Sequence, residues 1–93
     1  MEKVLEKSLK RYVLGAIEDG VCYYLKVRHT PIPGQLLSRV QYECTLDIES
    51  ATKATSRNIM ESVFETYLQN VGDDALDFVV IPLEISFSLI KEI

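Results

Sequence analysis

The dipeptide Asp19-Gly20 constrains the fold of this chain more than any other feature, because it separates two runs rich in Val, Ile, Tyr and Leu, residues 10–18 and 21–28. A type I′ turn needs a positive φ at both central residues, and Asp-Gly supplies them at little cost. The sequence therefore predicts a two-residue β-hairpin. The second run alternates in character, and the face predicted to point toward a core holds Val21, Tyr23, Leu25 and Val27.

The segments that flank this hairpin are less regular. Residues 1–10 carry Val4, Leu5 and Leu9, a spacing that fits either a short amphipathic helix or an extension of the first strand. After the hairpin, HTPIPGQLL contains Pro33-Gly34, which favours an exposed turn. The apolar residues of this loop are candidates for a lid: Ile32, Leu36 and Leu37.

The middle of the chain predicts a strand, a turn and a helix. Residues 39–46 alternate again, with one face formed by Val40, Tyr42, Cys44 and Leu46. A turn is expected over residues 47–52. Residues 57–69 then place apolar side chains at helical period, in a stripe of Ile59, Met60, Val63, Phe64, Tyr67 and Leu68. Ser56 is the natural N-cap, and Gly72 lies close to the C′ position.

Residues 77–90, DFVVIPLEISFSLI, predict a final strand. Pro82 cannot donate to a ladder, so this strand lies at an edge, carries a bulge, or divides into two pieces at Pro82. The predicted order is β-β-β-α-β in a single domain of residues 1–93. We expect an α+β fold, a small antiparallel sheet with one long helix packed on one face.

The charge of the chain bears on its partners. Ten Lys and Arg stand against fourteen Asp and Glu, which gives a formal net charge of -4 and disfavours nucleic acid as the main partner. Residues 1–28 hold six cationic residues and four acids, and the remainder holds four and ten. An acidic C-terminal two-thirds suits a basic protein partner, although a solvated acidic face is the simpler interpretation.

No catalytic or metal-binding motif is recognisable. His29 is the only histidine, and Cys22 and Cys44 are dispersed, so neither a nucleophile-histidine pair nor a zinc site is predicted. The four glycines form no phosphate-binding pattern. We expect no enzyme activity, no cofactor and no metal. Reduced cysteines and the lack of a ~20-residue apolar run predict a cytoplasmic protein without a membrane span.

The candidate site residues are therefore residues of contact. The predicted protein-contact set is Tyr24, Glu61, Glu65, Asp73, Asp74 and Asp77. Tyr24 is included because tyrosine is enriched at interfaces, whereas Tyr12, Tyr23 and Tyr42 are expected in the sheet core. If the protein instead binds a small anionic ligand, the candidate contacts are Lys26, Arg28 and Arg39.

Three segments, YVLGAIEDGVCYYLK, LDIESATKATSRNIMESVFETYL and DFVVIPLEI, resemble small bacteriophage and prophage proteins of uncharacterised function. The resemblance covers a hairpin, a "DIxxATK" turn that corresponds to Asp47, Ile48, Ala51, Thr52 and Lys53, a serine-capped helix and a final strand. It implies a ββ(β)αβ fold and a phage or mobile-element origin, and it implies no catalytic residue.

Two functional hypotheses follow. The first is a non-catalytic protein-interaction module, such as a phage-encoded, anti-CRISPR-like inhibitor that binds a host protein in the host cytoplasm. The second is a protein that binds or sequesters a small ligand such as a nucleotide. A third alternative is a homo-oligomeric structural protein, or a homodimer, assembled through the edge strand of residues 78–90.

Overall fold

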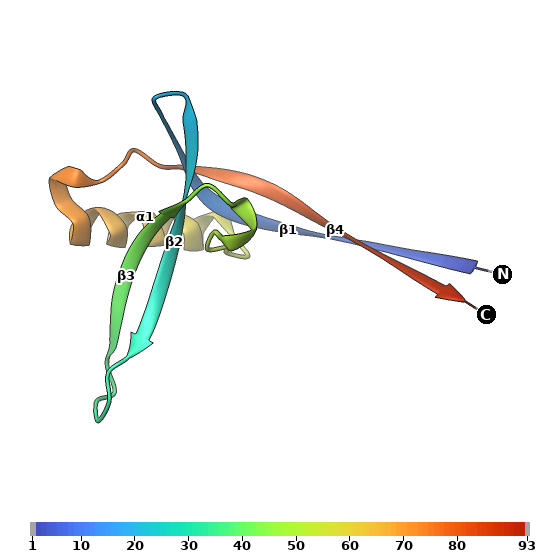
Figure 1. The fold of residues 1–93 in the computed structure, drawn as a ribbon, viewed down its shortest axis with the longest axis horizontal. Coiled ribbons are helices and arrows are strands. Elements are labelled where there is room, and N and C mark those ends of the chain that lie inside the picture. Colours follow the sequence, from blue (N-terminus) through green and yellow to red (C-terminus); the bar gives the residue numbers. More distant parts are fainter. Residues whose placement is uncertain (1, 93) are drawn as a thin grey trace.

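A computed structural model describes the backbone of residues 2–92 and the side chains of residues 8–86. Its main elements are β1 (Glu2–Glu18), β2 (Val21–Pro31), β3 (Ser38–Thr45), α1 (Arg57–Val71) and β4 (Val79–Glu92), with short 3₁₀ helices η1 (Ile48–Ser50) and η2 (Gly72–Asp74). The strands form one antiparallel sheet in the order β3-β2-β1-β4. The helix packs on one face, so the predicted α+β fold is confirmed (Figure 1).

The predicted hairpin joins β1 to β2. Asp19 has φ 52° and Gly20 has φ 79°, and the pair Glu18–Val21 closes the turn. Both central residues therefore have the left-handed backbone that a type I′ turn requires.

The N-terminal segment is a strand, and the alternative of an N-terminal helix is wrong. Its backbone pairs with β4 without interruption from Arg11–Leu83 to Glu2–Glu92. A ten-residue helix at a chain end would have been marginal in water, whereas strand pairing supplies backbone hydrogen bonds along the whole segment. The paired residues 2–11 and 83–92, called here the β1–β4 arm, extend away from α1 with both chain ends at the tip (Figure 1).

Pro82 lies on an edge strand, as predicted, and the alternatives of a bulge or a divided strand are wrong because the register passes through Tyr12–Pro82 unbroken. Tyr12 directs its N–H and C=O to Ala54, on the side away from β4. In an antiparallel ladder the residue opposite then points its own backbone groups away as well. The missing N–H of Pro82 therefore faces the open edge, where no ladder bond is lost.

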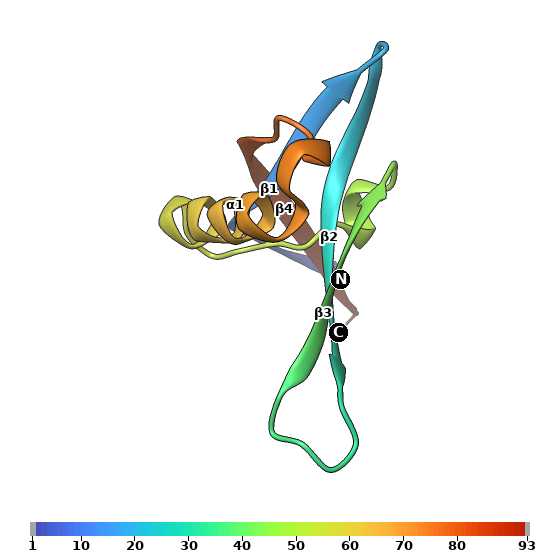
Figure 2. The same cartoon turned by 90° about the vertical axis from the view of Figure 1, so that its left-hand side faces the viewer.

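The strands β1 and β2 separate beyond the hairpin. They pair only from Glu18–Val21 to Gly15–Tyr24, after which β2 continues with β3 as a second arm. This β2–β3 arm, residues 26–43, ends in the loop of residues 32–37 (Figures 1 and 2). The gap between the separating strands is filled by residues 51–54, called here the bridging segment.

The bridging segment satisfies backbone groups of both strands. The Thr52 N–H donates to the Leu25 carbonyl at 3.1 Å, and the Val27 N–H donates to Thr52 Oγ1 at 2.7 Å. Ala54 pairs with Tyr12 of β1. Ala51 and Ala54 are buried, and the predicted turn before them is the η1 helix, which is capped at its start by the Asp47 carboxylate.

The core lies between α1 and the sheet. Its buried cluster consists of Leu14, Ala16, Leu25, Ala54, Met60, Tyr67 and Phe78. The Tyr67 ring meets Tyr42 and Phe78 edge to face at centroid distances of 5.4 and 5.2 Å, and its hydroxyl accepts a hydrogen bond from the Leu76 N–H at 2.8 Å. A tyrosine from the helix is thus the central aromatic residue of the core.

The ends of α1 are as predicted. Ser56 Oγ accepts from the Ile59 N–H at 3.2 Å, and Gly72, with φ 73°, ends the helix. The buried stripe is narrower than predicted, because Ile59 and Leu68 are 51% and 42% exposed. The six residues of the predicted stripe span more of the helix surface than packs on the sheet. Ile59 and Leu68 are at the two sides of the stripe and therefore lie at the edges of the contact between helix and sheet.

The prediction of a lid over residues 32–37 is wrong. Leu36 is fully exposed and Leu37 is 70% exposed. The loop lies at the tip of the β2–β3 arm, beyond the reach of α1 (Figures 1 and 2). The two arms give the chain a radius of gyration of 17.1 Å, compared with about 12 Å for a compact chain of this length.

Candidate protein-interaction surface

Five of the predicted contact residues are exposed and belong to α1 or the segment that follows it. Glu61 and Glu65 lie one turn apart on α1, away from the buried Met60 and Tyr67. Asp73 and Asp74 form the end of η2, directly after the helix, and Asp77 follows before β4. We call these five carboxylates the acidic surface.

Among the side chains of residues 8–86, no carboxylate of the acidic surface forms an ion pair. In the part of the chain whose side chains are described, the one ion pair is Arg28–Glu43, at 3.4 Å on the surface. Residues 58–90 contain six acids and no Lys or Arg. The negative charge of α1 and its C-terminal end is therefore concentrated in one stretch of chain.

The sixth predicted contact, Tyr24, lies apart from the acidic surface. It is half-buried on the sheet face opposite α1, where a Cβ added to Gly15 would lie 3.6 Å from its ring. The Cys22 side chain on the same face raises the pKa of the Tyr24 phenol, first through hydrogen bonding. The hydroxyl therefore stays protonated at neutral pH.

At its hairpin end, the same face carries exposed apolar side chains that were not among the candidates. Ile17 is 78% exposed and Val79 is 60% exposed. The sequence contained the information that places Ile17 on this face. Side chains alternate along a strand, so alternate residues of β1 face α1, and Gly15 and Ile17, which lie between them, face the other way.

An apolar groove lies between α1 and the β2–β3 arm, and the sequence did not indicate it. Its volume is about 400 Å³. The apolar lining comes from Val27, Val40, Tyr42, Ile59 and Val63. Its polar rim consists of His29, Ser62, Thr66 and Asn70, with the Asn70 amide donating to the Tyr42 hydroxyl at 3.1 Å. A groove of this kind fits an apolar side chain or a short apolar segment.

The alternative ligand residues share one face of the β2–β3 arm. The register places Lys26 opposite Glu43, Arg28 opposite Gln41 and Arg39 opposite Thr30. Alternation along the strands then puts all three cations on the same side. Arg28 is already paired with Glu43, which leaves Lys26 and Arg39 as the cations available to an anion.

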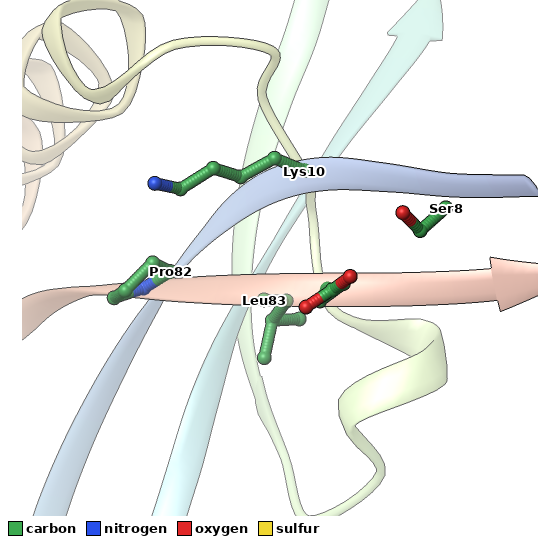
Figure 3. A pocket seen from close by; sticks show the side chains of 5 residues that line it. Ser8, Lys10, Pro82 and Leu83 are labelled. Atoms are coloured by element: carbon green, nitrogen blue, oxygen red, sulfur yellow. The ribbon is translucent and has the colours of Figure 1, made fainter.

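A wider hollow of about 540 Å³ lies on the β1–β4 arm. Figure 3 shows Ser8 and Lys10 of β1 beside Pro82 and Leu83 of β4. Lys10 and the fifth lining residue, Glu84, are opposite each other in register, so the hollow has no net charge for an ionic ligand.

Chemistry-bearing side chains are scattered. Among residues 8–86, no three His, Cys, Asp or Glu side chains meet as a metal ion would require. Cys22 and Cys44 are free and lie on opposite faces of the sheet, since Cys44 is opposite Leu25 and Cys22 has the other parity. Partial burial and the Glu18 charge raise the pKa of the Cys44 thiol, which disfavours its nucleophilic thiolate form.

None of the helices in the described part of the chain combines the length and the apolar character needed to cross a membrane.

Comparison of the chain with protein-family models, curated proteins and solved structures finds no significant match. The phage origin that the resemblance implies therefore stays a prediction.

Proposed function

We propose that this protein is a non-catalytic interaction module that binds a basic protein surface through its acidic surface. The observation that carries the proposal is the set of five exposed carboxylates on and after α1, in a stretch of chain without Lys or Arg. Charge complementarity of this kind increases association rates and favours the correct partner over others.

Helix electrostatics support the proposal, because the acids are misplaced for stability. The C-terminal end of a helix carries a partial negative charge, and nearby anions are unfavourable by about 0.3 to 1 kcal/mol each. Asp73 and Asp74 follow Gly72, the residue that ends α1, and the last turn of α1 contains no basic residue. A binding role accounts for acids at a position where folding alone disfavours them.

The narrower proposal is that the protein is phage-encoded and acts in the host cytoplasm as an anti-CRISPR-like inhibitor of a defence protein. Its support is the resemblance of the hairpin, the "DIxxATK" turn and the capped helix to phage proteins. An acidic surface can also compete for a site that evolved to bind nucleic acid. The same attraction between opposite charges would apply to any basic host protein.

The test is capture from a lysate with the immobilised full chain at low and at high salt, followed by mass spectrometry. The proposal predicts a stoichiometric, basic protein that is lost at high salt, because exposed charge interactions are screened. Recovery of no stoichiometric partner at low salt would count against it.

A second candidate function is binding of a small anion such as a nucleotide by Lys26 and Arg39, which the register places on one face. A ligand that binds only the folded state raises the melting temperature by mass action. A thermal-shift panel of nucleotides should then show stabilisation that is reduced in Lys26→Gln and Arg39→Gln. An unchanged melting temperature with every nucleotide would remove its support.

A further inference from the structure

The tip of the β2–β3 arm presents two leucines that its own chain leaves uncovered. Leu36 is fully exposed and Leu37 is 70% exposed. Backbone hydrogen bonds hold their loop in a defined turn, since the Ile32 N–H donates to the Leu37 carbonyl at 3.3 Å and the Gln35 N–H donates to the Ile32 carbonyl at 3.1 Å. An ordered loop that holds large apolar side chains in water is typical of a contact surface.

The groove between the same arm and α1 has matching chemistry. Its volume is about 400 Å³, and no Asp, Glu, Lys or Arg contributes to its lining. Two of its apolar side chains, Val40 and Ile59, are 42% and 51% exposed. The loop of residues 32–37, IPGQLL, is likewise uncharged. An uncharged apolar tip and an uncharged apolar groove can meet without burying an unpaired charge.

The exposed area is large enough for a stable dimer. The chain exposes 7162 Å². A compact monomer of 10.6 kDa exposes about 5,500 Å², so the excess is about 1,700 Å². A standard interface buries about 800 Å² on each partner. The excess is spread over the two arms, so the extended shape leaves the chain with more exposed surface than one standard interface needs.

We propose that two copies of this chain form a dimer by placing their β2–β3 arms side by side in opposite directions. Leu36 and Leu37 of each copy fill the groove of the other and contact Ile59 and Val40 there. In the register of the arm the groove residues form the pairs Val27–Tyr42 and His29–Val40, and the tip loop follows the pair Pro31–Ser38. With the two arms antiparallel (the tip of the arm is seen in Figure 2), a two-fold axis that crosses the arm between groove and tip satisfies both contacts at once. Such a contact is self-complementary and closes at two copies.

This dimer does not depend on the proposed function. It differs from a dimer formed through the edge of β4, where Pro82 interrupts the row of outward N–H groups. The carboxylates of Glu61 and Glu65 lie outside the groove and remain accessible. The dimer would therefore present the acidic surface twice.

Sedimentation equilibrium of the full chain tests the dimer. At about 100 µM, above the Kd of even a micromolar interface, the mass should be twice 10.6 kDa. Leu36→Asp/Leu37→Asp should be monomeric with an unchanged circular dichroism spectrum, because both side chains are exposed in the single chain. Leu46→Asp is the control, since Leu46 is 66% exposed but lies outside the tip and the groove, and it should remain dimeric. A monomeric wild-type protein, or a dimer that Leu36→Asp/Leu37→Asp leaves intact, would overturn the proposal.

A mixing experiment tests the exchange itself. Ile59→Lys alters the groove at an exposed position of α1, so the fold should persist, and in a mixed dimer the new lysine would face the altered tip of Leu36→Asp/Leu37→Asp without like-charge repulsion. Alone, this variant should be monomeric. Mixed with Leu36→Asp/Leu37→Asp, it should recover a heterodimer, because one tip and one groove remain intact as a pair. Failure to recover any dimer would contradict reciprocal exchange.

Discussion

Tyr12 and Ala54 exchange two backbone hydrogen bonds of 2.9 Å, and this pair connects the bridging segment to β1. The same segment connects to β2 through Thr52. The "DIxxATK" turn is therefore a structural element that connects two separating strands, and the Asp47 carboxylate and the Ser50 and Thr52 hydroxyls form hydrogen bonds within the chain. Function is better sought on the acidic surface and on the two arms.

Thr52→Val tests this structural role. The substitution keeps the branched shape of the side chain but removes the oxygen that accepts from the Val27 N–H at 2.7 Å. A partly buried N–H without a partner should cost about 1 to 3 kcal/mol in the free energy of unfolding. Urea denaturation measures it. Thr66→Val is the control, because Thr66 Oγ1 only donates to the Ser62 carbonyl on the exposed side of α1 and should change stability by less than about 0.5 kcal/mol. Equal effects of the two variants would contradict the role of the bridging segment.

Gly15→Ala tests the close packing around Gly15 on the sheet face opposite α1. A Cβ at this position would lie 2.5 Å from Ile81 Cδ1, so the isoleucine must move. We expect a loss of about 1 kcal/mol, at the low end of overpacking costs because the atom is a terminal methyl group. Ile81→Val removes that methyl and should recover part of the loss. A double variant with simply additive losses would show that this contact is not the cause.

Asp73→Asn/Asp74→Asn separates stability from binding. Removing two anions beside the C-terminal end of α1 should raise the free energy of unfolding by about 0.3 to 1 kcal/mol per position. Capture of the basic partner should fall in the same variant. A protein that is more stable and binds equally well would remove Asp73 and Asp74 from the proposed contact.

The stability of η1 should depend on pH through Asp47. Its carboxylate accepts from Ser50 Oγ at 2.8 Å and from the Glu49 N–H at 3.0 Å, and these bonds, the Ser50 bond first, hold the pKa of Asp47 below its ordinary value. Because the folded pKa is lower than the unfolded one, the stabilising contribution is complete above about pH 4 and is lost as the pH falls through the folded value. Denaturation of Asp47→Asn and wild type across this range should show the difference between them shrinking in acid. A difference that is constant with pH would contradict the assignment.

The elements with local signals were predictable from the sequence, and the long-range arrangement was not. Asp19-Gly20 specified its turn through backbone φ, and Ser56 specified the helix start through a hydrogen bond three residues away. The Tyr12–Ala54 pair depends on where β1 and β2 separate, which no local pattern encodes. The groove is equally non-local, because it exists only where the β2–β3 arm passes α1.

The candidate site was predictable to a similar extent. Glu61 and Glu65 were predicted as contact residues, they lie outside the apolar stripe that helical periodicity predicts, and they are exposed. Leu36 and Leu37 were predicted to pack as a lid because they are apolar. The sequence does not show the length of the arm that carries them away from the core, and both side chains are exposed.

Binding through the acidic surface is tested most directly by isothermal titration of the captured partner with Glu61→Gln/Glu65→Gln. The control, Glu18→Gln/Glu49→Gln, removes the same charge from exposed positions elsewhere. The account predicts that Kd rises by about tenfold or more for Glu61→Gln/Glu65→Gln, which corresponds to about 1.4 kcal/mol, and changes little for the control. Equal changes in Kd for the two variants would contradict it, because net charge alone would then explain the binding.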